Sequence, residues 1–379
     1  MDAKQQLEVL RGKLADIDKG ILALFAERMN ASVEIADIKA KANLSITDET
    51  QEARVIERAA GFAGEGLKAE SAALVRSLIS LSKLKQRQTL AARSDLLIAP
   101  SVPVLKEKLT VACQGARGAW GEQAAAEMYP EADRKFYDYF EDVFAAVKNG
   151  EADFGVLPIE NSQTGAIGEV YDLLRMNGCS IAGQVWIPIR QCLLGVRGAA
   201  LSDIREVFSH SQGLTQCRRF LKNKNWDLSA LRNTAVAAQT VMEKGEKRYA
   251  AIGSRWAAEI YGLDVIAPDI MDDAGNQTRF ITIASQPVYD ETCDITSVTF
   301  STEHISGALC SVLHTFMAAG VNLSRIESRP VSADRYRFFA DLQANVLNES
   351  VRFALEQASA QCRYFEVLGC YRSTPGSVS

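Results

Sequence analysis

The sequence has little of what several kinds of functional site require. Its 379 residues include three histidines, and its eight cysteines are scattered without a C-x-x-C pair. This excludes a histidine-rich zinc site and predicts that most of the cysteines are buried and reduced. No run approaches the roughly 18 to 20 apolar residues of a membrane span, and the N-terminal segment MDAKQQLEVLRGKL lacks the apolar core of a signal peptide. We therefore expect a cytoplasmic protein.

The sequence also has no large excess of positive or negative charge. The chain has 42 Lys and Arg residues against 47 Asp and Glu residues, for a formal net charge of -5. No broad basic field is available for nucleic acid or for an anionic membrane surface. Apolar residues make up 47% of the chain and charged residues 23%, which is typical of globular proteins. At about 100 to 200 residues per domain, the length predicts two or three domains.

Residues 1–93 have the pattern of helices. Apolar side chains recur every three or four residues from Leu7 to Phe25, with no proline and two glycines before Asn43. The pattern predicts one helix of about 40 residues, about 60 Å long, followed by helices near 48–60 and 68–91. Because two shorter helices cannot cover this length, we expect a homodimer with intertwined N-terminal helices.

Residues 94–107, with Pro100 and Pro103, are typical of a linker. From 108 to 285, short strand-like runs such as FGVLPI and YAAIG alternate with helical stretches such as 122–128, 140–149 and 215–223. This alternation predicts an α/β domain with a largely parallel sheet. We expect two lobes, with the chain crossing between them at 185–194 and near Gly262, and a ligand site in the cleft between lobes.

Residues 294–372 alternate in another order. Strand-like runs and helical stretches follow one another as strand, helix, strand, strand, helix, strand. This βαββαβ order predicts an α+β ferredoxin-like module. The fold class is therefore multidomain, with an all-α, an α/β and an α+β part.

Candidate polar residues in the first domain fall on the expected helices. Arg11, Arg28 and Lys39 lie on the long helix, and by spacing alone they are as compatible with solvated cations as with ligand-binding ones. Arg11 and Arg28 are some 25 Å apart along a straight helix, so Arg11 and Lys39 cannot meet within one helix, and an antiparallel partner helix could bring them together. Two pairs at i and i+4 each share one helical face: Asp48 and Glu52, and Ser82 and Gln86.

Four stretches stand out in the second domain: QGARGAWGEQAA, LPIENSQTG, FSHSQGLTQC and NQTRF. The first is a glycine-containing strand-to-helix turn, a weak indication of anion binding. Each of the others alone is compatible with ordinary turn chemistry. Their combination in one chain is more specific than any single stretch.

Taken together and in this order, these residues resemble the bifunctional chorismate mutase/prephenate dehydratase family over nearly the whole chain. The resemblance implies an all-helical chorismate mutase domain, a two-lobed dehydratase domain and a C-terminal ACT regulatory domain. It also implies a mutase site formed by Arg11 of the partner chain with residues of the same chain: Arg28, Lys39, Asp48, Glu52, Ser82 and Gln86. The rearrangement of chorismate to prephenate needs no nucleophile, metal or cofactor. Arginines can fix the substrate carboxylates while Lys39 and Gln86 donate hydrogen bonds to the ether oxygen.

For the dehydratase, the resemblance assigns the essential hydroxyl to Thr278, with Arg279 and Phe280 in the same motif. It places further residues around the cleft: Glu160, Asn161, Ser162, His210, Gln212 and Thr234. A threonine hydroxyl is a poor acid, so the proton for the departing hydroxide can come from Glu160 or from water. Ser211 and Gly121 depart from the family pattern, where proline and a hydroxyl residue are usual.

Two motifs in the third domain resemble the phenylalanine-binding signature of ACT domains. They are Gly307, Ala308 and Leu309 at a helix start, and Glu327, Ser328, Arg329 and Pro330 on the second strand. A helix N-terminus can hold an amino-acid carboxylate. The resemblance implies phenylalanine as an allosteric inhibitor, bound across an interface between two copies of the module.

Two other functions are compatible with the sequence. One is a dehydratase acting on arogenate, with the helical domain kept for dimerisation; the presence of all seven mutase residues argues against that loss. The other is a small-molecule sensor, but the sequence has no helix-turn-helix, basic stripe or membrane anchor as an output. Turnover of chorismate, as opposed to binding alone, separates an enzyme from a sensor.

Overall fold

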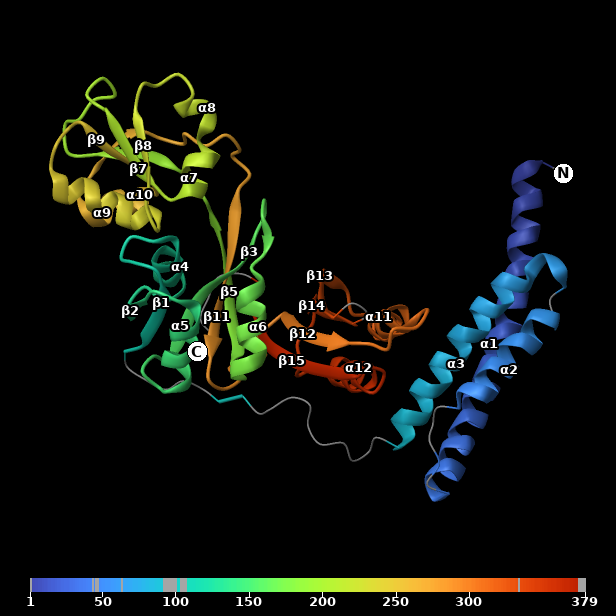
Figure 1. Cartoon of the computed structure of the whole chain (residues 1–379). Coiled ribbons are helices and arrows are strands. Elements are labelled where there is room, and N and C mark those ends of the chain that lie inside the picture. The colour runs from blue at the N-terminus through green and yellow to red at the C-terminus, as the bar shows by residue number, and fades with distance from the viewer. Residues whose placement is uncertain are drawn as a thin grey trace. The chain divides into compact units, whose positions relative to one another are not determined.

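The computed structural model describes residues 2–42, 44, 48–62, 64–90, 101–102, 108–332 and 335–373 (Figure 1). Most of the predicted linker 94–107 lies outside the described residues. The chain divides into two compact units. One contains the N-terminal helices, and the other contains both lobes of the α/β part together with the C-terminal strands. No helix within the described ranges is long and apolar enough to cross a membrane.

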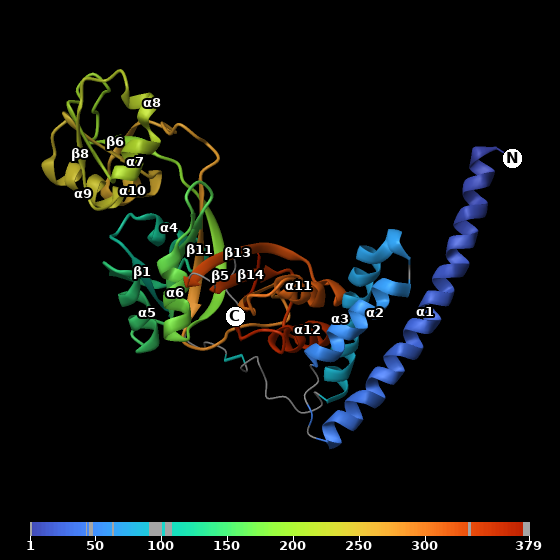
Figure 2. The same cartoon turned by 45° about the vertical axis from the view of Figure 1, so that its right-hand side comes forward.

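The N-terminal part is helical, as the sequence predicts. Its elements are α1 (Ala3–Lys41), α2 (Glu49–Phe62), the 3-10 turn η1 (Glu65–Leu67) and α3 (Lys68–Leu90). Figure 2 shows α1 as one unbroken helix, and its 39 residues confirm the predicted length. Two of its residues, Ser32 and Ala36, are buried. The predicted apolar stripe from Leu7 to Leu24 remains exposed, so α2 and α3 leave most of α1 uncovered.

The first lobe is built on a mixed sheet. Its elements are β1 (Thr110–Gln114), α4 (Trp120–Met128), β2 (Asp133–Tyr137), α5 (Phe140–Lys148), β3 (Phe154–Asn161), β4 (Gly165–Ala166), α6 (Gly168–Asn177), β5 (Ser180–Pro188) and β11 (Gln277–Ala284). Strands β2, β1 and β3 are parallel, and the returning strand β11 lies between β3 and β5, antiparallel to both. The prediction of a largely parallel sheet was therefore wrong. The chain returns from the second lobe at the end of the sheet where β3 terminates. The strand β11, which starts there, therefore runs antiparallel to β3 and β5.

The second lobe carries a separate five-stranded sheet in the order β10-β6-β9-β7-β8. Its elements are β6 (Cys192–Gly195), β7 (Glu206–Ser209), α7 (Ser211–Gln216), α8 (Arg218–Leu221), β8 (Asp227–Ala230), α9 (Thr234–Lys244), β9 (Tyr249–Gly253), α10 (Arg255–Tyr261) and β10 (Asp264–Ala267). The chain enters this lobe between β5 and β6, as predicted, and leaves it between β10 and β11, shortly after Gly262. The helix predicted at 215–223 is interrupted at Cys217. There the loop residue Asp272 bonds to both sides of the break, donating from its N–H to Gln216 O and accepting from Arg219 N.

The C-terminal part has the predicted βαββαβ order. Its elements are β12 (Ile295–Ser301), α11 (Ala308–Ala318), β13 (Leu323–Ser332), β14 (Arg335–Leu342), α12 (Glu349–Ser359) and β15 (Tyr364–Tyr371). The four strands are antiparallel in the order β13-β14-β12-β15. They continue the sheet of the first lobe, because Gly369 of β15 pairs with Ile181 of β5. A Cβ on Gly369 would lie 2.1 Å from the Ile181 carbonyl oxygen, so this close approach needs glycine.

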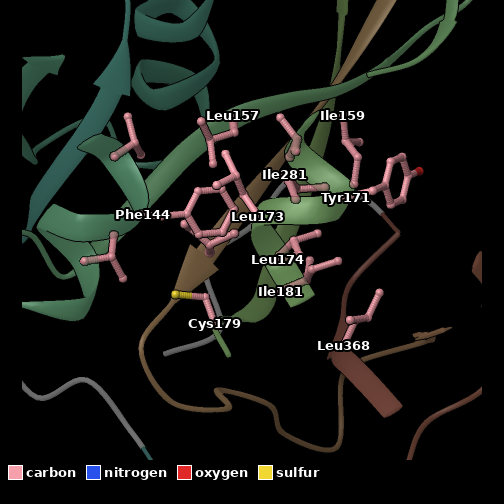
Figure 3. Packing of buried hydrophobic residues seen from close by; sticks show 14 of the residues in the cluster. Phe144, Leu157, Ile159, Tyr171, Leu173, Leu174, Cys179, Ile181, Ile281 and Leu368 are labelled. Atoms are coloured by element: carbon pink, nitrogen blue, oxygen red, sulfur yellow. The ribbon is translucent and has the colours of Figure 1, made fainter. Parts of the chain in front are cut away.

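The largest core cluster lies where α5 and α6 cover the first-lobe sheet. Figure 3 shows the α6 side chains Tyr171, Leu173 and Leu174 beside Leu157, Ile159 and Ile281 of β3 and β11. Leu368 and Tyr371 of β15 belong to the same cluster. The C-terminal strands and the first lobe thus share a core.

Candidate active sites

Candidate mutase residues gather between α1 and α3. Arg28 Nη1 donates to Leu78 O at 2.8 Å and also to Ser82 Oγ. Ser82 and Gln86 are 6% and 8% exposed, and Gln86 Oε1 is buried without a hydrogen-bond partner. Burial lowers the pKa of the Arg28 guanidinium. The partly buried Arg28 guanidinium can bind an anionic group of a ligand, and Gln86 Oε1 can accept a hydrogen bond from a ligand hydroxyl.

Helix α2 contributes Glu52, with a partner that sequence reasoning missed. Lys83 Nζ lies 2.7 and 2.8 Å from the two carboxylate oxygens of Glu52. Asp48 immediately precedes α2, and its Oδ1 accepts a hydrogen bond from Gln51 N at 2.9 Å. A lysine on a helix is usually solvated, and only its position beside Ser82 could have singled out Lys83.

Arg11 and Lys39 lie at a distance from this group along α1. Lys39 follows Arg28 by three helical turns on the same face and is half-buried. Arg11 is exposed, and the 17 residues between it and Arg28 correspond to about 25 Å. Its neighbours on α1 are exposed apolar residues, among them Leu7, Leu10 and Leu14 at 53–58%. Arg11 therefore cannot join Arg28 within one chain.

The dehydratase candidates centre on Thr278 and Asn161. These residues are paired in register on β11 and β3, and both are largely buried. Asn161 Nδ2 donates to Thr278 Oγ1 at 2.9 Å. The orientation of this amide is fixed, because Asn161 Oδ1 accepts from the backbone N–H groups of Gln163 and Thr164. Since the hydroxyl oxygen accepts from Asn161, its hydrogen is left to donate elsewhere.

Asn276 completes this group and was not among the predicted site residues. It is fully buried, and its Oδ1 accepts from Asn161 Nδ2 at 2.7 Å. Its own Nδ2 is buried without a partner. The residue is the first of the NQTRF stretch, so the motif that contains Thr278 also indicated Asn276.

Ser162 joins β3 to the start of β11. Its Oγ accepts from Gln277 N at 2.9 Å, and its own N–H donates to Gln277 O at 2.9 Å. The serine therefore uses its hydroxyl to hold the backbone next to Thr278.

Arg279 and Glu160 point away from Thr278, toward the C-terminal strands. Arg279 is 5% exposed and bonds to Gln184, Asp341 and Tyr371. Burial opposes its charge, but Tyr371 and Asp341 raise the pKa of Arg279 above its ordinary value. Side chains alternate along a strand, so the neighbour of Thr278 must face the opposite side of the sheet. Arg279, which the resemblance places in the same motif as Thr278, therefore contacts the C-terminal strands on the other face of the sheet.

A β-bulge explains the position of Glu160. The register between β3 and β11 shifts between Arg279 and Phe280, which leaves Ile159 as the extra residue. Bulges of this kind re-aim side chains next to functional sites. Here Glu160 lies opposite Arg279 and Asn161 lies opposite Thr278. Phe280, beyond the bulge, is 3% exposed and packs in the core under α4.

The second-lobe candidates lie where strands end and helices begin. His210 precedes α7, and its Nδ1 accepts from Gln212 N at 3.2 Å. Thr234 begins α9, and a Cβ on Gly213 of α7 would lie 3.5 Å from Thr234 Cγ2. The parallel strands β7 and β9 end at this edge. The carboxyl edge of parallel strands is a common position for ligand sites in α/β proteins.

The two lobes are joined by contacts from α10. Trp256 Nε1 donates to Glu122 Oε2 at 3.1 Å, and the same oxygen accepts from Gly118 N at 2.6 Å. Tyr261 OH donates to Arg117 O at 2.6 Å. The glycine-containing turn that suggested anion binding is thus held against the second lobe. A Cβ on Gly118, whose φ is +84°, would lie 2.9 Å from the Tyr261 ring.

The expected regulator residues lie in two segments. Gly307, with φ of +83°, precedes α11, which begins with Ala308 and Leu309. Glu327, Ser328, Arg329 and Pro330 lie on the edge strand β13. Arg329 donates to the carbonyl oxygen of Gly168, at the start of α6. Any Cβ at Gly168 would collide with the Arg329 guanidinium, so this contact depends on glycine.

Comparisons with known proteins agree with the division of the chain into a helical part and an α/β part. The family model for chorismate mutase type II matches residues 10–87, and that for prephenate dehydratase matches residues 111–288. The bifunctional chorismate mutase/prephenate dehydratase of Enterobacter agglomerans is 30% identical over 386 residues, covering 98% of this chain and 97% of the relative. Arogenate dehydratase/prephenate dehydratase 2 of Arabidopsis thaliana is 36% identical over 277 residues, covering 70% of this chain and 73% of the relative.

A solved structure is also similar. Prephenate dehydratase from Arthrobacter aurescens, in complex with L-Phe, has a TM-score of 0.63 and 30% identity, covering 72% of this chain and 93% of that chain. The chain contains a chorismate mutase domain and a prephenate dehydratase domain in the order of the bifunctional relatives. It belongs to the bifunctional chorismate mutase/prephenate dehydratase family.

Proposed function

We propose that residues 1–93 rearrange chorismate to prephenate, that residues 108–285 convert prephenate to phenylpyruvate, and that residues 294–372 form an ACT domain through which phenylalanine inhibits the second reaction. The observation that carries the dehydratase assignment is the hydrogen bond from Asn161 Nδ2 to Thr278 Oγ1. It fixes the hydroxyl of the motif and leaves its hydrogen available to a substrate.

The mutase reaction is a matter of orientation and preorganised charge. Chorismate is a dianion, and negative charge gathers on its ether oxygen as the C–O bond breaks. Arg28, held by Leu78 O and Ser82, binds one carboxylate. Arg11 of a partner chain binds the other, since it lies too far along α1 to serve its own site. Lys39 and Gln86 donate to the ether oxygen.

This mechanism requires a homodimer. The exposed apolar side chains of α1, 48–67% exposed at Leu7, Leu10, Leu14, Ile17, Ile21 and Leu24, support a second α1 as the partner surface. Burial of such side chains contributes roughly 1.5–3 kcal/mol each. The same pairing would bring Arg11 to the partner's Arg28 site.

The dehydratase reaction is driven by aromatisation. The electron pair of the ring carbon–carboxylate bond moves into the ring as CO₂ leaves, and the pair of the ring carbon–hydroxyl bond departs with the oxygen, which takes up a proton to become water. Thr278 donates a hydrogen bond to this oxygen, and Asn161, by donating to Thr278 Oγ1, orients the hydroxyl for that contact. Asn276 holds Asn161 in place.

Glu160 is not assigned the proton transfer. Its Oε2 forms an ion pair with Arg325 Nε at 2.9 Å and lies 3.9 Å from Arg279 Nη1. This carboxylate is therefore engaged with arginine side chains and not with Thr278. We assign Glu160 to the contact between the catalytic lobe and the C-terminal strands, and we take water as the proton source.

Phenylalanine inhibition is proposed from the C-terminal module. The βαββαβ order of residues 294–372, together with the Gly307–Leu309 and Glu327–Pro330 motifs, supports an ACT domain. The related dehydratase of Arthrobacter aurescens was solved with L-Phe. An inhibitor acts in this way if it binds the less active state more tightly.

The test is a coupled assay on the full chain. Chorismate is supplied, its loss and the formation of phenylpyruvate are followed, and the assay is repeated with phenylalanine. Loss of chorismate with phenylpyruvate formation that phenylalanine slows would support all three assignments. If prephenate accumulates, the mutase assignment survives and the Thr278 mechanism for prephenate fails. Arogenate is then the substrate to test, because a relative that covers 70% of this chain carries arogenate dehydratase in its name.

A further inference from the structure

Two residues of the catalytic strands are held by the C-terminal strands. Arg279 Nη1 lies 2.6 Å from Asp341 Oδ2 of β14, and its Nη2 donates to Tyr371 OH of β15 at 2.8 Å. The side chains of Arg279 and Asp341 are 6% and 9% exposed. The start of the catalytic strand β11 is therefore anchored in the C-terminal module by buried, charge-assisted hydrogen bonds.

A second contact starts from β13, the strand that carries the expected phenylalanine-binding residues. Arg325 Nε lies 2.9 Å from Glu160 Oε2. Its guanidinium lies over the Tyr171 ring, 5.3 Å from the centroid, and donates to the Tyr171 hydroxyl. Its side chain is 14% exposed, and Arg325 Nη2 is 3.7 Å from Glu327 of the same strand.

These contacts reach the reaction site through single chain neighbours. Glu160 precedes Asn161, and Arg279 follows Thr278, so each residue held by the C-terminal strands is covalently next to one partner of the Asn161–Thr278 hydrogen bond. N–H···O hydrogen bonds have donor–acceptor distances of about 2.7–3.2 Å and weaken steeply when the donor angle falls below about 120°. A displacement of about 1 Å at a catalytic group can lower a rate by about a hundredfold.

We propose that the Arg325–Glu160 ion pair couples occupation of the C-terminal module to the geometry of Asn161 and Thr278, which makes Arg325 a positioning residue. This inference rests on the proposed inhibition by phenylalanine. A ligand on β13 that engages Glu327 changes the surroundings of Arg325, and Arg325 forms an ion pair with Glu160. Because the contacts of Arg279 hold β11 in place, a displacement of Glu160 on β3 changes the distance between Asn161 and Thr278.

The experiment uses Arg325→Met in the full chain. The control is Arg363→Met, which removes an exposed ion pair with Glu303 elsewhere in the C-terminal part. For each protein we would measure the dehydratase rate without and with saturating phenylalanine, and phenylalanine binding by calorimetry. An allosteric coupling typically corresponds to a ratio of about 5 to 150 between the two states. The inhibition ratio should fall to about 1 in Arg325→Met while phenylalanine still binds, and should stay at the native value in Arg363→Met.

The possible outcomes separate the claims. Native-like inhibition in Arg325→Met overturns the coupling alone. Loss of phenylalanine binding shows that Arg325 is a ligand-binding residue, which also overturns it. A native chain that phenylalanine does not inhibit refutes the regulatory proposal, and the coupling with it. Should Arg325→Met lack dehydratase activity, Arg325→Lys keeps the charge without the planar fork and should show a reduced inhibition ratio; a native ratio there refutes the coupling.

Discussion

Replacing Thr278 by valine tests the dehydratase mechanism, because it removes one oxygen and keeps the shape. The change deletes the acceptor for Asn161 Nδ2, 2.9 Å away. That donor keeps two other acceptors, Asn276 Oδ1 at 2.7 Å and Gln277 O at 3.1 Å. No donor is left unsatisfied, so the loss of folding free energy should be that of one ordinary hydrogen bond, about 0.5–1.5 kcal/mol.

The loss of rate should be much larger than the loss of stability. A preorganised hydrogen-bond donor at an atom that gains charge contributes about 10²–10³ in rate, and each factor of ten corresponds to about 1.36 kcal/mol of barrier. Thr278→Val should therefore raise the dehydratase barrier by about 3–4 kcal/mol. Thr278→Ser keeps the hydroxyl and should retain most of the rate.

The assay follows phenylpyruvate formation from prephenate with native, Thr278→Val and Thr278→Ser chains. The mutase rate of the same preparations serves as the reference for active protein, because the helical domain does not contain residue 278. Unfolding of each chain in urea gives the stability. A valine chain within about threefold of the native rate, less than 1 kcal/mol of barrier, would refute the role of the hydroxyl.

Three further changes test other parts of the structure. Arg279→Met leaves the Asp341 carboxylate buried without its cation, so the free energy of unfolding in urea should fall by about 3–5 kcal/mol, and adding Asp341→Leu should recover much of the loss. Burial raises the pKa of Tyr171 to about 12 and also raises the pKa of Tyr371. Because the pKa of an unfolded tyrosine is about 10, the contribution of these two buried tyrosines to folding stability is complete below pH 10. It is lost as the pH rises through the pKa values of the folded state. Urea unfolding from pH 9 to 11 should show the decline, and a flat profile contradicts it. Gln86→Glu should make the mutase rate fall with rising pH as the new carboxyl group ionises, whereas the native amide does not titrate; identical pH profiles would exclude residue 86 as the donor.

Local sequence patterns predicted most of the elements. The helix α1 and the six C-terminal elements follow from side-chain periodicity, which depends only on which residues face a core. The break between α7 and α8 was missed because it depends on Asp272, far along the chain. The mixed sheet was missed for a similar reason: the direction of β11 depends on where the chain returns from the second lobe, and a strand's own residues carry no sign of it.

The structure brings several of the candidate residues together: Asn161 and Ser162 contact Thr278 and its neighbour Gln277, and Arg28 contacts Ser82. The stretches LPIENSQTG and NQTRF also contain Glu160 and Arg279, which contact the C-terminal strands. A motif identifies residues but does not predict which face of the sheet each one occupies, because the faces depend on the register between β3 and β11.

Strand geometry gives this arrangement a functional meaning. Because successive residues of a strand face opposite sides, β11 can present Thr278 to the substrate and Arg279 to the C-terminal module without any intervening structure. On β3, Asn161 faces the same side as Thr278 and Glu160 the same side as Arg279 only if Glu160 is paired with Arg279. The bulge at Ile159 provides this register. The bulge therefore places Glu160 and Arg279, the chain neighbours of Asn161 and Thr278, in contact with the C-terminal strands. On the proposed mechanism, each of these two strands thus carries a residue that acts on the substrate directly beside a residue that contacts the C-terminal strands.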